Sequence, residues 1–204
     1  MPVEEDLRAL AAEVGACTKC KLHAGRIKAV PGEGPANAEL MFIGEGPGFH
    51  EDQQGRPFVG AAGKFLDELL GYAGLRREEV FIANVVKCRP PGNRDPEPDE
   101  LEACAGYLER QIAVLNPKVI VTLGRYSMAR FFPNAKISAI HGQARKLDHQ
   151  VVVAMFHPAA ALHQQSLRNT VVADFKKLPE LIAQARAEIL PIVDDEPPQQ
   201  MSMF

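Results

Sequence analysis

Four segments of strand length are almost continuously apolar and rich in β-branched residues. They cover residues 40–43, 80–86, 119–123 and 151–156. Such runs are typical of strands buried on both faces of a parallel sheet. Residues 4–14, 61–73, 100–115 and 171–189 instead repeat apolar positions at the period of a helix. The pattern predicts an α/β fold, a three-layer α/β/α sandwich with a central four-stranded parallel sheet.

The same pattern predicts the limits of the domain. Residues 1–190 contain all the strands and helices and are expected to form a single domain. Residues 191–204, PIVDDEPPQQMSMF, are acidic and Pro-rich, which predicts a flexible tail. Within the domain, Asp99 followed by Glu102 is a capping-box pattern and predicts the start of the third long helix.

Polar and Gly/Pro-rich motifs follow directly after each predicted strand. GEGPG (44–48) follows the first strand, and NVVKCRPP (84–91) ends the second. LGR (123–125) ends the third and FHP (156–158) ends the fourth. In open α/β sheets, ligands bind at the carboxyl ends of the strands. We therefore expect a binding site at this edge of the sheet.

Composition and charge narrow the class of protein. The 204 residues are 46% hydrophobic and 24% charged, with a net charge of −3. This excludes a uniformly basic nucleic-acid coat protein but leaves a local basic face open. No apolar run approaches the roughly 20 residues of a membrane span, and the acidic start MPVEEDLRAL does not resemble a signal peptide. We expect a cytosolic, cytoplasmic monomer with no membrane partner.

The four cysteines are spaced as candidate metal ligands. Cys17 and Cys20 form a C-x2-C pair, Cys88 follows the second strand, and Cys104 lies in the third long helix. A disulfide framework is not expected in a cytosolic protein. A C-x2-C pair can present two thiolates to one metal centre, which two further cysteines would complete. Spacing leaves zinc and an iron–sulfur cluster open, with a redox dithiol or a set of buried apolar residues as alternatives.

With the four cysteines, further motifs occur in a characteristic order: GEGPG (44–48), GRPFVG (55–60), N-x-V-K-C-R-P-P-x-N-R (84–94) and MFHPA (155–159). Together they resemble the family 4 uracil-DNA glycosylases, the iron–sulfur members of the uracil glycosylase superfamily, over roughly residues 14–190. The resemblance implies a [4Fe–4S] cluster of structural role on Cys17, Cys20, Cys88 and Cys104. It also implies hydrolysis of the N-glycosidic bond of uracil in DNA, which initiates base excision repair.

Three residues of these motifs suit that chemistry. Phe58 is suited to stack on a pyrimidine flipped out of DNA. The Asn84 carboxamide can accept from uracil N3–H and donate to O4, and cytosine presents the reverse pattern. His157 is placed to donate to O2 as negative charge develops there. The alternatives are a core aromatic for Phe58, a strand-end cap for Asn84 and a turn residue for His157.

The first motif departs from the best-known uracil glycosylases. Glu45, Gly46 and Pro47 are expected to line the opposite side of the base, where glycine permits close approach of the backbone. The well-known enzymes carry a water-positioning Asp where this chain has Gly46. Glu45 is therefore the candidate to position water or stabilise the cationic sugar; the alternative is that it holds the loop.

DNA contacts are expected around residues 157–168, HPAAALHQQSLR. Leu162 is a candidate wedge for the space left by the flipped base, or alternatively a buried leucine. Lys87, Arg89, Arg94 and Arg168 are candidate phosphate contacts.

The remaining hypotheses concern a partner for the end of the chain and two alternatives to the glycosylase function. Gln200, Met201, Met203 and Phe204 resemble the Q-L-x-L-F peptide that binds the bacterial sliding clamp, although short peptides also match by chance. An iron–sulfur redox protein and a nonenzymatic DNA-binding module are the alternatives to the glycosylase. No motif places a lysine in the pocket, so a monofunctional enzyme without lyase activity is expected.

Overall fold

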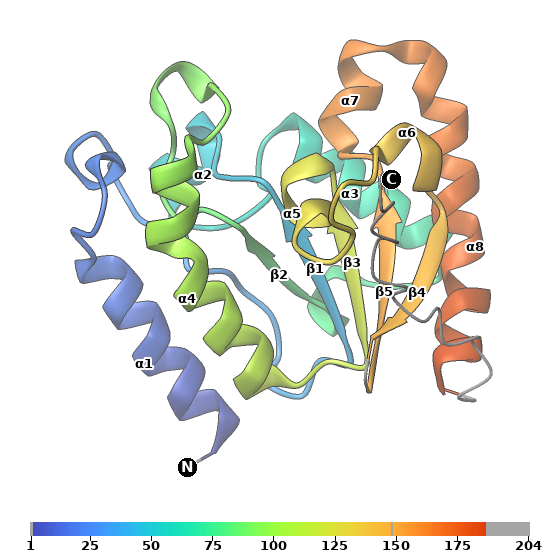
Figure 1. Ribbon diagram of the computed structural model, residues 1–204, viewed down its shortest axis with the longest axis horizontal. Coiled ribbons are helices and arrows are strands. Elements are labelled where there is room, and N and C mark those ends of the chain that lie inside the picture. Colours follow the sequence, from blue (N-terminus) through green and yellow to red (C-terminus); the bar gives the residue numbers. More distant parts are fainter. Residues whose placement is uncertain (1, 148, 187–204) are drawn as a thin grey trace, which may run out of the picture.

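One five-stranded sheet forms the centre of the protein (Figure 1). The computed structural model describes residues 2–147 and 149–186. The strands are β1 (Leu40–Gly44), β2 (Phe81–Asn84), β3 (Val119–Leu123), β4 (Gln143–Leu147) and β5 (Gln150–Met155), in the order β2-β1-β3-β5-β4. Four strands are parallel and β4 is antiparallel to β5. The predicted sandwich is confirmed, with one edge strand more than the four predicted.

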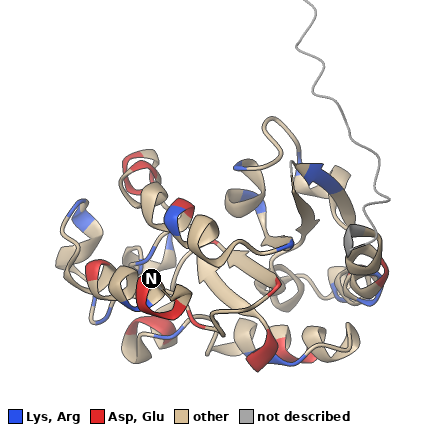
Figure 2. Ribbon diagram, turned by 90° about the horizontal axis from the view of Figure 1, so that it is seen from below, with Lys and Arg blue, Asp and Glu red and all other residues tan. Residues whose placement is uncertain are grey.

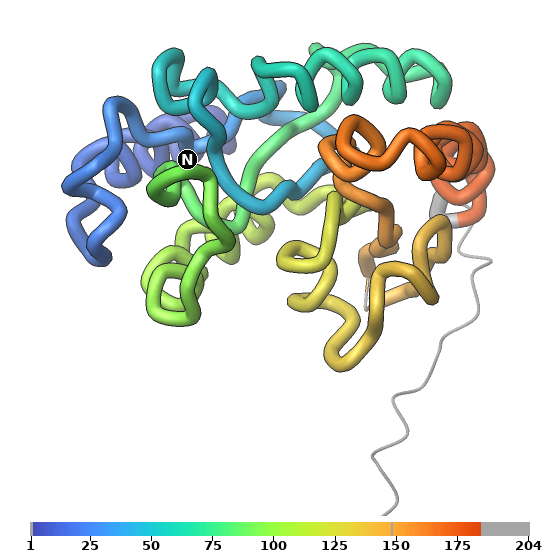
Figure 3. Tube along the Cα trace, turned by 90° about the horizontal axis from the view of Figure 1, so that it is seen from above, coloured from blue at the N-terminus to red at the C-terminus, as the bar shows by residue number. Residues whose placement is uncertain are grey.

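Helices cover both faces of the sheet (Figures 1 and 3). They are α1 (Val3–Ala16), α2 (Phe49–Gln54), α3 (Ala61–Tyr72), α4 (Pro98–Leu115), α5 (Arg125–Ala129), α6 (Ile137–Ile140), α7 (Pro158–His163) and α8 (Arg168–Arg186). Short 3-10 helices cover Lys21–Ala24, Arg77–Glu79, Pro91–Asn93 and Gln165–Leu167. In the described ranges, no helix combines the length and the apolar character that crossing a membrane requires.

Each face of the sheet has its own core. On one face, Phe42 stacks on Phe175 of α8 with ring centroids 6.3 Å apart, and α3 packs beside them. On the other face, Ile43 packs with Leu108 of α4 and Met128 of α5. Alternate residues of the same strand thus face opposite layers, as a doubly covered sheet requires.

The start of α4 differs from the prediction at Asp99 and Glu102. The helix begins at Pro98, and the Glu97 amide donates to the Glu100 carboxylate at 2.8 Å. Proline favours the first helical position because its missing N–H has no partner there in any case. The capping interaction therefore lies two residues earlier than predicted.

The ends of β1 and β2 lie side by side and bring two of the motifs together. Gly44 pairs with Asn84 in the parallel register. The predicted strand at residues 80–86 is shorter, because β2 ends at Asn84. The next two amides, of Val85 and Val86, still donate to the carbonyls of Gly44 and Glu45, each at 3.1 Å. The Glu45 loop is therefore held beside Asn84.

Candidate active site

A pocket of about 650 Å³ opens at the carboxyl ends of the parallel strands, the end of the sheet seen in Figure 3. Its size is in the usual range of small-molecule sites. Its lining includes every residue predicted to contact the base: Glu45, Gly46, Pro47, Phe58, Asn84 and His157. These residues come from four separate motifs, three of which follow strands as the strand-end argument predicted; the fourth, GRPFVG (55–60), carries Phe58 on the loop between α2 and α3.

Asn84 presents an unpaired acceptor inside this pocket. The residue is only 1% exposed, and its Oδ1 has no hydrogen-bond partner in the part of the chain that the structure describes. A Cβ on Gly44 would lie 2.4 Å from that oxygen, so glycine is required beside it. Leaving a buried acceptor unpaired is unfavourable, and a ligand N–H would remove the penalty.

His157 is held as a neutral donor. Its Nδ1 accepts from the Ala159 amide at 3.1 Å, so the proton of the neutral ring resides on Nε2. Burial lowers the pKa of His157 to about 4, which keeps the ring uncharged at neutral pH. The ring is nearly parallel to that of Phe58, with centroids 5.5 Å apart and planes at 25°. The pocket therefore combines an aromatic wall with an Nε2–H donor.

Glu45 lies within the first motif, GEGPG (44–48), and lines the pocket. Burial raises the pKa of Glu45, and the nearby Asp95 raises it further, while Arg125 opposes the shift. A Cβ on Gly46 would lie 2.7 Å from the Val86 side chain. An aspartate at residue 46 would therefore need the chain to shift, which leaves Glu45 as the carboxylate of this motif.

Lys87 does not contact phosphate, and that prediction is wrong. The side chain is 1% exposed, and its Nζ donates to the Asn84 carbonyl at 2.9 Å and to Gln111 Oε1 at 2.6 Å. Burial lowers the pKa of Lys87 to about 8. The Lys87 side chain thus holds the backbone of Asn84, the last residue of β2.

Two of the predicted DNA contacts lie near the pocket, one of them exposed and the other half-buried. Leu162 on α7 is 42% exposed, which rules out the alternative of a buried leucine. The Arg89 guanidinium lies 5.2 Å from the ring centroid of Phe49, a pocket residue that is 50% exposed. Arg89 also donates to Asn93 at 2.7 Å. An exposed ring with a half-buried cation beside it is suited to nucleic acid.

The other two predicted phosphate contacts have acidic partners. Arg94 binds both oxygens of Glu100, at 2.8 and 2.6 Å. Arg168 donates to Glu68 at 2.9 Å and lies over the Phe65 ring. Figure 2, seen from the end opposite the pocket, shows both Lys and Arg and Asp and Glu distributed over the described part of the chain. These ion pairs reduce the positive charge available to phosphates.

All four cysteines line one small cavity near α1 and α4: Cys17, Cys20, Cys88 and Cys104. None is in a disulfide. The Cys88 sulfur accepts from the Arg26 guanidinium at 3.2 Å, and the Cys104 sulfur accepts from the Lys87 amide at 3.3 Å. In residues 2–147 and 149–186, no three His, Cys, Asp or Glu side chains are gathered closely enough to ligate one metal ion.

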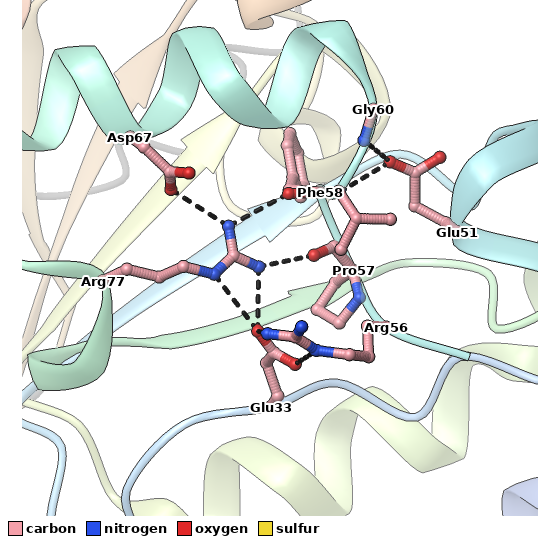
Figure 4. Close-up of polar contacts among 9 residues, drawn as sticks. Glu33, Glu51, Arg56, Pro57, Phe58, Gly60, Asp67 and Arg77 are labelled. Atoms are coloured by element: carbon pink, nitrogen blue, oxygen red, sulfur yellow. Dashed lines mark hydrogen bonds and ion pairs between the residues drawn. The ribbon is translucent and has the colours of Figure 1, made fainter. Parts of the chain in front are cut away.

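Sequence reasoning missed two residues that hold the loop carrying Phe58. Figure 4 shows the Arg77 guanidinium against the loop from one side and the Glu51 carboxylate from the other. Arg77 lies in the run RREE (76–79), a pattern typical of a solvated turn. Its partners lie far away in the sequence, so no local pattern could have identified it.

Comparisons with known proteins show the family of this chain. The sequence profile of the Uracil DNA glycosylase superfamily matches residues 31–179. A type-4 uracil-DNA glycosylase of Sulfurisphaera tokodaii is 49% identical over 87% of this chain and 85% of its own. The type-4 enzyme of Archaeoglobus fulgidus is 46% identical over 87% and 94% of the two chains. That of Thermotoga maritima is 44% identical over 88% and 96%. This chain belongs to the uracil DNA glycosylase superfamily, as a member of its type-4 family.

Proposed function

We propose that this protein is a monofunctional uracil-DNA glycosylase, which flips uracil out of DNA and hydrolyses its N-glycosidic bond to leave an abasic site. The observation that carries this proposal is the unpaired, buried Oδ1 of Asn84 in the same pocket as the neutral Nε2–H donor of His157. The two groups offer an acceptor and a donor to one planar ligand. Uracil, with N3–H and two carbonyls, matches both.

Recognition of the base follows from these groups. The flipped ring stacks on Phe58, and Asn84 accepts from N3–H through Oδ1 and donates to O4 through its amide. Cytosine has an acceptor at N3 and a donor at C4, so it would leave these buried groups unpaired. A site built on such hydrogen bonds discriminates strongly against a ligand that cannot complete them.

Cleavage breaks the bond between C1′ and N1, and the electron pair leaves with uracil. His157 donates through Nε2–H to O2, where the negative charge of the departing base collects. Glu45 orients the water whose oxygen bonds to C1′ and accepts the proton that the water loses. The Gly46 and Pro47 turn closes the opposite side of the base.

We further propose that Cys17, Cys20, Cys88 and Cys104 hold a [4Fe–4S] cluster, which would supply cross-linking of the surrounding segments without a role in turnover. Four sulfurs around one cavity suit a cluster in which each cysteine binds a different iron. N–H groups and the cationic Arg26 at two of the sulfurs suit an anionic group.

DNA contacts are proposed on the exposed rim of the pocket. Leu162 enters the space that the flipped uracil vacates, and Arg89 contacts a phosphate beside Phe49. Arg94 and Arg168 are proposed as weaker contacts, because Glu100 and Glu68 already neutralise them. Single-stranded and double-stranded DNA both fit this description.

The end of the chain lies outside the described residues. We propose from its sequence that Gln200, Met201, Met203 and Phe204 bind a sliding clamp, and that the protein is a cytoplasmic monomer. Clamp binding by the full chain, lost on removal of residues 200–204, would test the first point.

The proposed activity is tested with an oligonucleotide that carries one uracil. Anaerobically purified protein is added, abasic sites are cut with alkali, and the released base is identified by mass spectrometry. We expect cleavage at uracil and free uracil, with none at cytosine in the same position. An intact oligonucleotide after treatment with iron-loaded protein would contradict the proposal and favour the redox or binding-module alternative.

The pH profile is expected to identify Glu45. Because catalysis needs the carboxylate, the single-turnover rate should fall as pH drops through the raised pKa of Glu45, with a midpoint above the ordinary 4.5. Asp95→Asn should lower that midpoint, because it removes a negative neighbour. Arg125→Gln should raise it. An acid limb unchanged in Glu45→Gln would assign the limb to another group.

Metal analysis is expected to separate a cluster from zinc. The protein as purified without oxygen should contain about four irons and four sulfides per chain and absorb visible light. Cys104→Ser should lose most of the iron and unfold at a lower temperature, because Cys104 is buried against α1. One zinc per chain in a colourless protein would contradict the cluster.

A further inference from the structure

Phe58 adopts a backbone conformation that bulky residues seldom occupy. Its φ is 51°, in the left-handed region. The carbonyl of Phe58 itself is packed so closely that a Cβ on Gly63 would lie 1.9 Å from its oxygen. Such a conformation persists only where surrounding contacts impose it. The contacts around this loop therefore determine where the Phe58 ring lies.

Arg77 supplies two of these contacts on the backbone itself. Its Nη2 donates to the Pro57 carbonyl at 2.6 Å, and its Nη1 donates to the Phe58 carbonyl at 3.0 Å (Figure 4). These carbonyls belong to the peptide groups on either side of the Phe58 Cα. The orientation of those two groups defines φ and ψ of Phe58, so one guanidinium holds both angles.

The Arg77 fork is itself held in place. Glu33 Oε1 accepts from Nε at 3.1 Å and from Nη2 at 2.9 Å, and Asp67 accepts from Nη1 at 3.1 Å. The Arg77 side chain is 21% exposed. Glu33 also binds Arg56 at the start of the loop. A lysine could keep the charge here but could not fill these positions with one ammonium.

Glu51 completes the arrangement on the opposite side of the loop. Its Oε1 accepts from the amides of Val59 at 2.8 Å and Gly60 at 2.9 Å, and its Oε2 accepts from the Gly48 amide at 3.1 Å. The loop is thus fixed through carbonyls by Arg77 and through amides by Glu51. Glu51 also ties it to the GEGPG turn of the pocket.

We propose that Arg77 is a positioning residue, which holds Phe58 in its left-handed conformation so that the ring forms the stacking platform for the flipped base. The proposal rests on the proposed function, since the platform matters only if a base enters the pocket. Arg77 itself lies behind the loop and acts through Phe58.

Arg77→Met and Arg77→Lys are compared with Arg76→Met as the matched control. Arg76 is the neighbouring residue, and its side chain pairs with Glu78 and Glu79 instead of the loop. We expect Arg77→Met to lower the single-turnover rate of uracil excision by about 10- to 100-fold, because small misplacements of binding groups have effects of that size. Arg77→Lys should recover little of the rate, and Arg76→Met should stay within about twofold.

The same substitutions in a Phe58→Leu background separate positioning from general destabilisation. If Arg77 acts through the Phe58 ring, Arg77→Met should cost less than about threefold once the ring is absent, because coupled residues are not additive. An equal loss in both backgrounds would overturn the proposal, as would full activity of Arg77→Met.

Amide hydrogen exchange provides a readout that does not depend on activity. The amides of Val59 and Gly60 should exchange faster in Arg77→Met and Arg77→Lys than in Arg76→Met, while the β1 and β3 amides remain protected. Unchanged exchange in this loop would overturn the proposal. If the wild type does not excise uracil while the Arg77 variants show the expected faster exchange, the proposed function alone would be refuted.

Discussion

Asn84→Ala is expected to slow uracil excision by about 10³-fold, because the substitution removes both hydrogen bonds that we propose distinguish uracil from cytosine. The Asn84 side chain is buried, and its Oδ1 accepts no hydrogen bond from any residue within the described ranges. Loss of the Asn84 carboxamide should therefore weaken recognition of the base and leave the fold intact. The measurement is the single-turnover rate on a uracil oligonucleotide, together with affinity for DNA that contains an abasic site.

Asn37→Ala is the matched control, because Asn37 is an exposed asparagine in the loop before β1 and does not line the pocket. Its rate should equal that of the wild type. The Asn84→Ala protein should bind abasic DNA as the wild type does. Loss of DNA affinity in parallel with the rate would mean that Asn84 supports the surface that binds DNA instead of the base.

His157→Leu is expected to lower the single-turnover rate by about 10²- to 10³-fold, the usual effect of removing a donor to a developing anion. His157→Gln, which retains an N–H donor on a side chain of similar length, should recover part of that loss. Because the ring stays neutral down to a pKa of about 4, the rate should show no inflection from His157 near pH 6.5. An inflection near pH 6.5 that vanishes in His157→Gln would show that the charged ring takes part.

Acid stability gives an independent measure of the same residue. Between pH 6.5 and 4 the unfolded chain binds a proton at residue 157 that the folded chain excludes, so the free energy of unfolding falls as pH drops through this range. A pKa of about 4 in the folded state corresponds to a loss on the order of 3 kcal/mol. The His157→Gln protein should lack this component of the pH dependence, which urea unfolding at several pH values would measure.

The buried framework of this fold could be predicted because parallel strands covered on both faces leave a clear apolar pattern. β1 and β3 are such strands. β4 was missed because its sequence, QARKL, is polar and lies at the exposed edge of the sheet. Charged residues such as Arg145 and Lys146 are common on edge strands, where they discourage pairing with other chains. A search for buried runs therefore passes over an edge strand.

The part of the candidate site that lies at the ends of strands could be predicted from the motifs there. Asn84 and His157 follow strands and converge in the pocket. Lys87 was misjudged because a lysine is buried only with partners, and its partner Gln111 lies far along the chain, in α4. Arg77 was missed for the same reason, since its acceptors in residues 57–58 and at Glu33 are brought to it by the fold. Long-range polar contacts leave no periodic trace in a sequence.

The central claim is that one pocket holds the flipped uracil between Phe58, Asn84 and His157. The most direct measurement is a crystal structure with DNA whose deoxyuridine carries a 2′-fluorine, which slows cleavage by destabilising the cationic sugar. We predict uracil stacked on Phe58, with N3 at Asn84 Oδ1 and O2 at His157 Nε2, each at a hydrogen-bond distance of about 2.9 Å. A uracil that remains in the duplex, or one bound outside this pocket, would contradict the account.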